Sequence, residues 1–281
     1  MKIILSRKGF DSSCGGVASP IFPDGTLLSL PIPDPKGTLA YQDLRWGEHP
    51  LGDLVEALTH RRLTREARVH LDPDLYGALC PRPPGWRPLF GQDGAAQSHL
   101  ANQGVGVGDL FLFFGWFRAV EQQHGHYHFV KAAPNQHLIY GWLQVGSVLT
   151  GEEVGQAAPP WAAAHPHCVA GRGARNTLYI AGDQLTVDGC ATAWPGAGYI
   201  SHYRDDLCLT APGTLRTRWR LPRWFYPSAG KPPLSYHTDS TRWSCDADYT
   251  YLRSATRGQE FVLDTQYYPE AGQWTVAFVR Q

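Results

Sequence analysis

The chain has 281 residues, and its 25 lysines and arginines are balanced by 25 aspartates and glutamates. A formal net charge of zero excludes attraction of nucleic acid through the overall field of the protein, so any such contact must come from a local patch. The six cysteines lack the paired spacing of zinc or redox sites, and no apolar run reaches the roughly 18 residues of a membrane span. We therefore expect a soluble, cytoplasmic protein with no membrane partner.

Residues 3–5 predict a first strand, which delivers the polar segment 6–16 directly after its end. Glycines in this segment permit tight turns and close ligand approach, and Arg7, Lys8 and Ser12 could hold a phosphate together with backbone N–H groups. Neither the Walker A nor the dinucleotide-binding pattern is present. The next acidic residue, Asp11, is either a general base or a partner in a structural ion pair with a neighbouring cation.

Residues 19–34 predict a hairpin with a central Asp-Gly turn, and residues 51–60 predict an amphipathic helix because apolar side chains recur on one face. A short strand beginning at Val69 then runs into a turn. His70 and Asp72 would lie on the same side of that strand and could act as a pair, although a solvated Asp-Pro turn explains the aspartate without any function.

The densest mixture of apolar and polar groups follows. Residues 110–117 are apolar and aromatic without a break, which favours a strand buried on both faces over a helix. The preceding residues 89–107 predict a polar loop that carries Gln92, Gln97 and His99 to one rim of this strand. Side-chain amides can pair with the edge of a base and aromatic rings can stack on it. Alternatively, the amides satisfy turn backbone and the aromatics form the core.

Three histidines alternate between residues 124 and 128 and would share one face of a strand. An exposed hairpin tip is predicted there instead, and no acidic or thiol ligand is close in the sequence, so no metal residue is assigned. Residues 137–149 predict a long strand with a glycine bend, a feature that can coil a sheet toward a barrel. The proline-rich loop 159–168 ends in two histidines, and strand character resumes at 176–180.

The last strands are predicted at residues 215–226, 260–264 and 274–279. In the first, arginine alternates with aromatic residues, which suits either a half-buried strand or phosphate pairing beside base stacking. Because no low-complexity linker interrupts the chain, we predict one α+β domain over residues 1–281, built on a strongly bent, mostly antiparallel sheet or barrel. Few short helices, long loops and a barrel core near 105–150 complete this prediction.

Several ordered motifs carry a resemblance to a known family, namely Ser6-Arg7-Lys8-Gly9-Phe10-Asp11, Pro31-Ile32-Pro33-Asp34, Phe90-Gly91-Gln92 with Gly94-Ala95-Ala96-Gln97-Ser98-His99-Leu100, Gly108-Asp109-Leu110-Phe111-Leu112-Phe113-Phe114-Gly115 and His165-Pro166-His167. Together they resemble the nucleotide modification associated domain 3 proteins, which implies a role beside DNA base-modification systems. The passage 107–145 is also similar to the core of PUA-like barrels, which implies recognition of a modified or flipped base.

We therefore predict an enzyme that binds a nucleotide or an extruded nucleobase and takes part in making or processing a modified base in nucleic acid. DNA is favoured over RNA, and the sequence identifies neither a cofactor nor a protein partner. The candidate catalytic residues are Asp11, His99 and His167. The candidate substrate-binding residues are Arg7, Lys8, Ser12, Asp34, Gln92, Gln97, Phe114, Arg118, Trp142 and His165.

Two other functions fit the same residues. The first is a reader module for modified bases that performs no chemistry and needs only satisfied hydrogen bonds, whereas an enzyme needs titratable groups near one reactive atom. The second is a metal-dependent hydrolase. Its candidate ligands are His124, His126, His128, His165 and His167.

Overall fold

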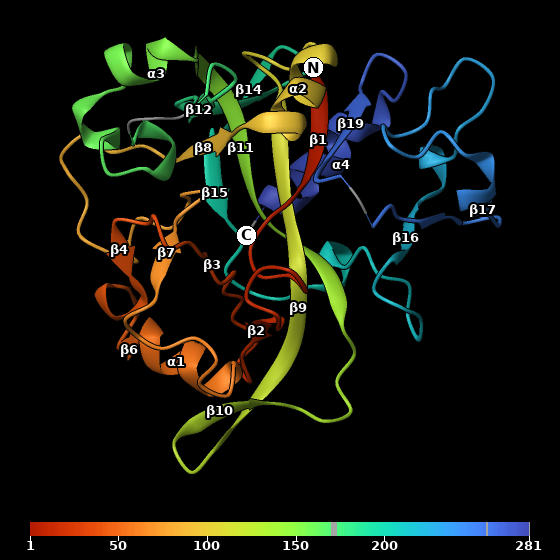
Figure 1. The fold of residues 1–281 in the computed structure, drawn as a ribbon. Coiled ribbons are helices and arrows are strands. Elements are labelled where there is room, and N and C mark those ends of the chain that lie inside the picture. The colour runs from red at the N-terminus through yellow and green to blue at the C-terminus, as the bar shows by residue number, and fades with distance from the viewer. Residues whose placement is uncertain (170–172, 257, 281) are drawn as a thin grey trace.

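The computed structural model describes residues 1–169, 173–256 and 258–280 (Figure 1). Its centre is a nine-stranded sheet in which two long strands, β9 (Leu110–Gln123) and β11 (Gln136–Thr150), pair antiparallel. The side chains from Leu110 to Phe114 are fully buried, as the unbroken apolar run predicts for a central strand. The predicted strands 110–117 and 137–149 are therefore confirmed.

The main path of this sheet is β19–β1–β9–β11–β12–β8, and three short strands pair with β9 or β11 outside it. Two neighbours of β9, namely β1 and β2, run parallel to it, whereas the other pairs are antiparallel. The members besides β9 and β11 are β1 (Lys2–Arg7), β2 (Ser19–Ile21), β8 (Leu89–Gln92), β10 (His126–Phe129), β12 (Thr177–Ala181), β15 (Ala197–Tyr199) and β19 (Glu260–Asp264).

The predicted glycine bend is present in β11. The register with β9 shifts between Ile139 and Gly141, and a Cβ atom on Gly141 would lie 2.5 Å from Leu75 Cδ1. Glycine is therefore needed for close packing at this irregularity. The bend does not lead to closure, because the strand path is open within the described part of the chain. The architecture is mixed α and β in several sheets, and the PUA-like barrel near 105–150 is not confirmed.

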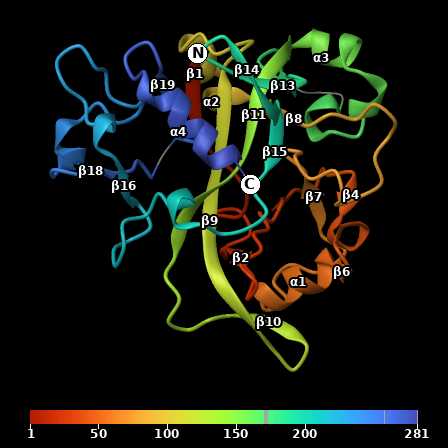
Figure 2. The ribbon, with the colours of Figure 1, turned by 180° about the vertical axis from the view of Figure 1, so that it is seen from behind.

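Four smaller sheets flank the central one (Figures 1 and 2). On one side lie α1 and the strands of residues 32–70, and on the opposite side lies the sheet formed by residues 218–253. The groups are β3 (Ile32–Pro33) and β4 (Leu39–Ala40) with β7 (Arg68–His70); β5 (Arg45–Trp46) with β6 (His49–Pro50); β13 (Gln184–Val187) with β14 (Cys190–Pro195); and β16 (Arg218–Pro222) and β17 (Trp243–Cys245) with β18 (Tyr249–Arg253).

The helices are α1 (Leu51–Leu58), α2 (Gly94–Asn102), α3 (Glu152–Ala157) and α4 (Glu270–Val279). The predicted helix at 51–60 is confirmed, but the predicted strand at 274–279 is wrong. Buried positions of α4 include Ala271, Thr275 and Val279, which are spaced four apart as on one helix face. None of the described helices has the length and apolar character needed to cross a bilayer.

Two further predictions are corrected. The polar loop expected at residues 89–107 contains β8 and α2, which begins after Asp93 accepts a hydrogen bond from the Gly94 N–H group. The hairpin expected at 19–34 is reduced to one antiparallel bridge between Ile21 and Leu27, because β2 pairs with β9 and β3 pairs with β7. Both segments prefer partners that are distant in the sequence.

Two histidines are buried in the core in neutral form. His137 Nδ1 accepts a hydrogen bond from Trp219 Nε1 at 3.0 Å, and burial lowers the pKa of His137 to about 3. His237 Nε2 accepts a hydrogen bond from the Ala255 N–H group at 2.9 Å, and burial lowers the pKa of His237 to about 4. An unfolded histidine has an ordinary pKa of about 6.5, so the unfolded chain binds protons that the folded chain excludes.

Lowering the pH from 7 to 5 is therefore expected to destabilise the fold. The free energy of unfolding decreases as the pH is lowered wherever the unfolded state binds more protons than the folded state. Each excluded proton lowers the free energy of unfolding by about 1.4 kcal/mol per pH unit below about pH 6.5. Urea unfolding followed by tryptophan fluorescence measures the free energy of unfolding at each pH. Its dependence on pH should be weaker in His237→Gln but unchanged in His202→Gln, which alters an exposed histidine. An unfolding free energy that is the same at both pH values would contradict this prediction.

Candidate metal centre

Two short motifs bring three imidazoles around one buried carboxylate. His70 ends β7 and Asp72 lies just beyond it, whereas His165 and His167 belong to the first turn of a 3₁₀ helix, Pro166–Cys168. The Asp72 Oδ2 atom lies 3.6 Å from His70 Nε2 and 3.7 Å from His167 Nε2. One ligand atom from each of these three residues lies within 4.8 Å of the other two.

The tautomers of His70 and His167 are fixed by partners on the far side of each ring. His70 Nδ1 lies 2.9 Å from Asp34 Oδ2, so its N–H group donates to a carboxylate. His167 Nδ1 lies 2.6 Å from Asn176 Oδ1, and Asn176 Nδ2 donates to the backbone carbonyl of His167, which sets the orientation of the amide. Both Nδ1 atoms therefore carry a proton, and both Nε2 atoms face Asp72. Burial opposes protonation of His70, but the hydrogen bonds and charges of Asp72 and Asp34 outweigh it and raise the pKa of His70.

Burial and neighbouring groups set the charges of His167 and Asp72. Burial lowers the pKa of His167 to about 4, partly offset by the charge of Asp72, so the ring is neutral near pH 7. Burial opposes ionisation of Asp72, but the neighbouring imidazoles of His165, His70 and His167 outweigh it and lower the pKa of the carboxyl. The lone pair of neutral His167 Nε2 and the Asp72 carboxylate thus converge with His70 Nε2. A cation among these three atoms, either a proton on His70 or a metal ion in its place, offsets the repulsion between acceptors this close.

The donor set suits a divalent transition metal. Ligands held at about 2.1 Å in tetrahedral geometry lie about 3.4 Å apart, close to the observed separations of 3.6 and 3.7 Å. Two histidines and one carboxylate with further positions open to water or substrate are typical of zinc and non-haem iron sites. Asp34 and Asn176 act as the outer partners that orient such histidines and set their tautomer.

His165 adds a proton donor to the centre. Its Nδ1 accepts a hydrogen bond from the His167 N–H group at 3.3 Å, so the neutral ring carries its proton on Nε2. This Nε2 is buried and lies 3.5 Å from Asp72 Oδ1, beyond good hydrogen-bond distance. Asp72 Oδ1 accepts the Gly91 N–H group at 2.7 Å. The Nε2–H group therefore faces the carboxylate of the centre.

Gly91→Ala is expected to displace His167 and weaken metal binding at least tenfold. A Cβ atom at Gly91 would lie 2.2 Å from two ring atoms of His167, so the imidazole must move or the strand must shift. Overpacking of this kind also costs about 1–3 kcal/mol of stability. Calorimetric titration with Zn²⁺ and urea unfolding measure the two effects. Gly106→Ala is the matched control because nothing lies within 4 Å of its Cβ position, and equal affinity in both variants would refute the contact.

An apolar pocket of about 280 Å³ opens beside this centre. Its lining includes His165, Leu71, Trp86 and Trp161, and Arg82 stacks over Trp86 with 4.4 Å between the guanidinium carbon and the ring centroid. The volume is close to the lower end of ligand-binding pockets, which are mostly apolar with a few placed polar groups. Two indoles next to a proton donor could hold a flat heterocycle by stacking.

A buried polar cluster adjoins the centre through the end of β8. Lys8 Nζ lies 2.9 Å from Glu260 Oε1, and Gln92 Nε2 donates to the same oxygen at 2.6 Å. The second carboxylate oxygen of Glu260 is buried without a hydrogen bond. Gln92 directly follows Gly91 in β8, and the Gly91 N–H group donates to Asp72 Oδ1 at 2.7 Å. The cluster and the metal centre are therefore neighbours along β8.

Five of the residues proposed from the sequence lie in these two groups of side chains. Asp34, His165 and His167 surround the metal centre, and Lys8 and Gln92 belong to the polar cluster. His70 and Asp72 were considered only as a pair, and Asn176 and Glu260 were missed. The repeated pattern of two polar candidates separated by one residue, in 70–72 and in 165–167, is the sequence signal for the centre.

Other proposed residues have mainly structural contacts. Asp11 Oδ1 accepts three hydrogen bonds from Ser13 and Cys14 within its own turn, which also holds the exposed Ser12. Arg7 donates to the backbone carbonyls of Thr256 and Gly258. These contacts match the structural alternative for the first polar segment, a turn stabilised by its own aspartate.

The remaining proposed residues belong to the core or to its edges. Gln97 is buried and accepts a hydrogen bond from the Tyr179 hydroxyl at 3.0 Å, so the predicted place on the rim of a polar loop is wrong. His99 contacts Ser235 Oγ at 3.0 Å. The others are placed as follows: Phe114 in the core, Trp142 donating to the Pro195 carbonyl, and Arg118 donating to the carbonyls of Val130 and Lys131.

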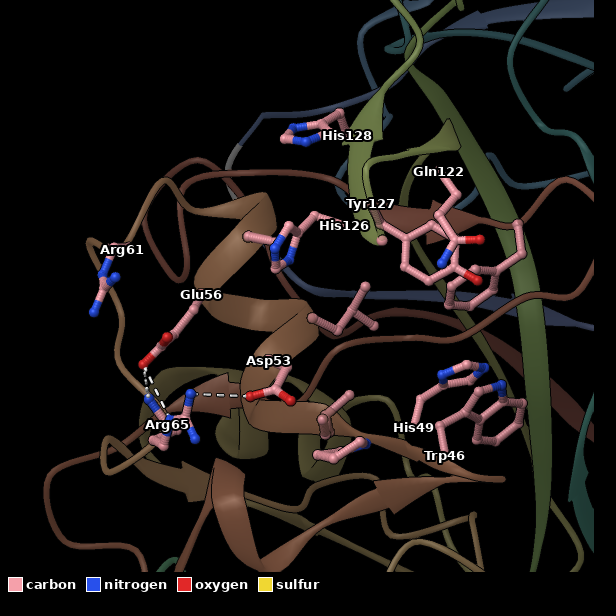
Figure 3. Close-up of a pocket in the computed structure, with 16 residues that line it drawn as sticks. Trp46, His49, Asp53, Glu56, Arg61, Arg65, Gln122, His126, Tyr127 and His128 are labelled. Carbon is pink, nitrogen blue, oxygen red and sulfur yellow. Dashed lines mark hydrogen bonds and ion pairs between the residues drawn. The ribbon is translucent and has the colours of Figure 1, made fainter.

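The alternating histidines 124–128 lie on the β9–β10 hairpin, as predicted for its tip. His126 and His128 line a pocket of about 500 Å³ whose other wall is α1, where Arg65 pairs with Asp53 and Glu56 (Figure 3). Among residues 1–169, 173–256 and 258–280, only His70, Asp72 and His167 are grouped as metal ligands. A hydrolase built on the hairpin histidines is therefore not supported.

Comparison with known families decides where the chain belongs. The model of nucleotide modification associated domain 3 matches residues 2–264, which is nearly the whole chain. The chain is a nucleotide modification associated domain 3 protein. No curated protein and no solved structure matched it. Membership connects this nucleotide modification associated domain 3 protein with base-modification pathways, and the resemblance noted from its motifs is confirmed.

Proposed function

We propose that this protein is a metal-dependent enzyme that binds a nucleotide or an extruded nucleobase and processes a modified base. The single observation that supports metal dependence is the convergence of His70 Nε2, His167 Nε2 and Asp72 Oδ2, with both tautomers set by outer partners. A reader module would have no need for three converging ligand atoms with oriented rings, since recognition requires only satisfied hydrogen bonds. Family membership supports the nucleotide as the class of substrate.

The residues divide the chemistry between them. A bound divalent metal would polarise a substrate oxygen or lower the pKa of a bound water toward neutrality. His165 lines the pocket, and its buried Nε2–H group beside Asp72 would serve as the proton donor to a leaving group that enters the centre. Trp86 and Trp161 would stack on the base and exclude water, which strengthens the electrostatic interactions in the site.

Two measurements on the purified full chain test the proposal. Elemental analysis and calorimetric titration with Zn²⁺, Mn²⁺ and Fe²⁺ should give one metal per chain, and His126→Gln should leave this stoichiometry unchanged. Mass spectrometry of nucleosides after incubation of nucleotides and oligonucleotides with the loaded protein should then detect a changed base. Absence of stoichiometric metal would refute the metal centre, and bound metal without any nucleotide binding at millimolar ligand would refute the substrate class.

A further inference from the structure

The sheet formed by β16, β17 and β18 has one buried and one solvent-facing side. Trp219 and Leu221 of β16 are buried, whereas Arg218 and Arg220 point to the other side because side chains alternate along a strand. In β18, Thr250 and Leu252 are buried and Tyr249, Tyr251 and Arg253 are exposed or half-buried. Arg218 pairs with Arg253, and Arg220 with Tyr251, in the sheet register. We call Arg218, Arg220, Tyr249 and Tyr251 the arginine–tyrosine face.

Guanidinium groups and phenol rings stack on this face. The guanidinium carbon of Arg220 lies 4.7 Å from the centroid of Tyr249, and that of Arg218 lies 5.6 Å from the centroid of Tyr251. Among the described residues, neither arginine forms an ion pair with a carboxylate. Each guanidinium therefore keeps donors and a positive charge for a ligand while its plane is held by a ring.

The charge of this region differs from that of the chain as a whole. Residues 216–253 contain seven lysines and arginines against three aspartates, a net charge of +4, whereas the full chain is neutral. The acidic side chain nearest to the tyrosines, Asp246, is occupied by the Tyr251 hydroxyl and by the N–H groups of its own turn. The local positive charge predicted to be necessary for contact with nucleic acid is therefore present here.

The positive charge continues toward the polar cluster. Arg216 stacks over Trp116, with 4.2 Å from its guanidinium carbon to the ring centroid, and the charge of Arg216 reaches Arg7. Lys8, the next residue, pairs with Glu260 beside the metal centre. In Figures 1 and 2 the small sheet lies beside β19, the edge strand that begins with Glu260. Arg216 and Arg7 thus extend the cationic side chains from the arginine–tyrosine face toward the polar cluster, where Lys8 is already paired.

We propose that the arginine–tyrosine face binds single-stranded nucleic acid. Arginines would pair with phosphates, and bases would stack on the tyrosine rings or on the guanidinium planes, the combination used by strand-binding surfaces. A duplex keeps its base faces covered, so the face selects a single strand. The role in delivering a base to the metal centre rests on the proposed function, but binding to the face does not.

Fluorescence anisotropy with fluorescein-labelled (dT)12 and (rU)12 tests this face between 50 and 200 mM salt. The double variant Arg218→Gln/Arg220→Gln should bind at least tenfold more weakly, and its salt slope should fall by about 1.4, or about 0.7 per lost phosphate contact. Tyr249→Leu/Tyr251→Leu keeps apolar bulk but removes the rings, so it should weaken binding at least fivefold with an unchanged salt slope. Arg45→Gln/Lys131→Gln, at exposed positions elsewhere, is the matched control.

Three results would overturn the proposal: no binding of either strand at 50 mM salt, equal losses in the face and control variants, or a duplex that binds as tightly as the strands and ignores the tyrosine substitutions. Circular dichroism verifies that each variant is folded. Metal stoichiometry should be unchanged in Arg218→Gln/Arg220→Gln, whereas Asp72→Asn should lose metal and keep (dT)12 binding. Loss of strand binding and loss of metal binding are therefore measured independently, so that either proposal can be refuted without the other.

Discussion

Asp72→Asn is expected to abolish stoichiometric metal binding while leaving the fold intact. The substitution keeps the shape of the side chain and the oxygen that accepts the Gly91 N–H group, but it removes the negative charge that the two imidazoles cannot supply. Loss of a residue that only hydrogen-bonds to a ligand costs about 10–100-fold in metal affinity, so loss of the anionic ligand itself should cost at least 100-fold. Calorimetric titration with Zn²⁺ gives the affinity.

The control for this experiment is Asp24→Asn, which changes an exposed turn carboxylate with the same loss of charge. Its metal affinity should match that of the original chain. Circular dichroism and the thermal midpoint verify that both variants remain folded. If Asp72→Asn binds Zn²⁺ as tightly as the control, the carboxylate is no ligand and the proposed centre is refuted.

Phe113→Ala should produce the largest loss of stability. Its ring is fully buried between Phe111, whose centroid lies 6.0 Å away, and Phe90 at 5.3 Å. Truncation of a buried phenylalanine costs about 3–5 kcal/mol, a large part of the roughly 5–15 kcal/mol that stabilises a domain. The thermal midpoint should fall by roughly 6–20 °C at about 2–4 °C per kcal/mol. Urea unfolding gives the free energy directly, and a loss below about 1 kcal/mol would contradict this packing.

Gln97→Ala provides the comparison with a polar residue. Gln97 is buried and accepts a hydrogen bond from the Tyr179 hydroxyl at 3.0 Å, although the sequence placed it on the rim of a polar loop. The variant leaves that hydroxyl without its partner, so it should lose about 1–3 kcal/mol of stability. The same unfolding assay applies, with the exposed Gln103→Ala as control. Unchanged stability would show that water replaces the amide.

The elements that the sequence predicted well are those whose pattern is local. The unbroken apolar run of β9, the long apolar strand β11 and the one-sided periodicity of α1 each identify an element from a few neighbouring residues. The failures occur where local patterns are ambiguous. Residues 274–279 alternate enough to suggest a strand, but α4 buries positions at helical spacing against the rest of the core. The segment 94–102 has little amphipathic pattern, so α2 was missed.

For the candidate centre, the sequence by itself determined the chemical types of the ligands and their pairing as His-x-Asp and His-x-His. Only the tertiary structure decided that His70, Asp72 and His167 meet, because this depends on long-range packing of β7, β8 and a 3₁₀ helix. The tautomers were also beyond the sequence. They are set by hydrogen bonds to Asp34 and Asn176, which come from other parts of the chain, and a proton's position on an imidazole follows from its partner in space.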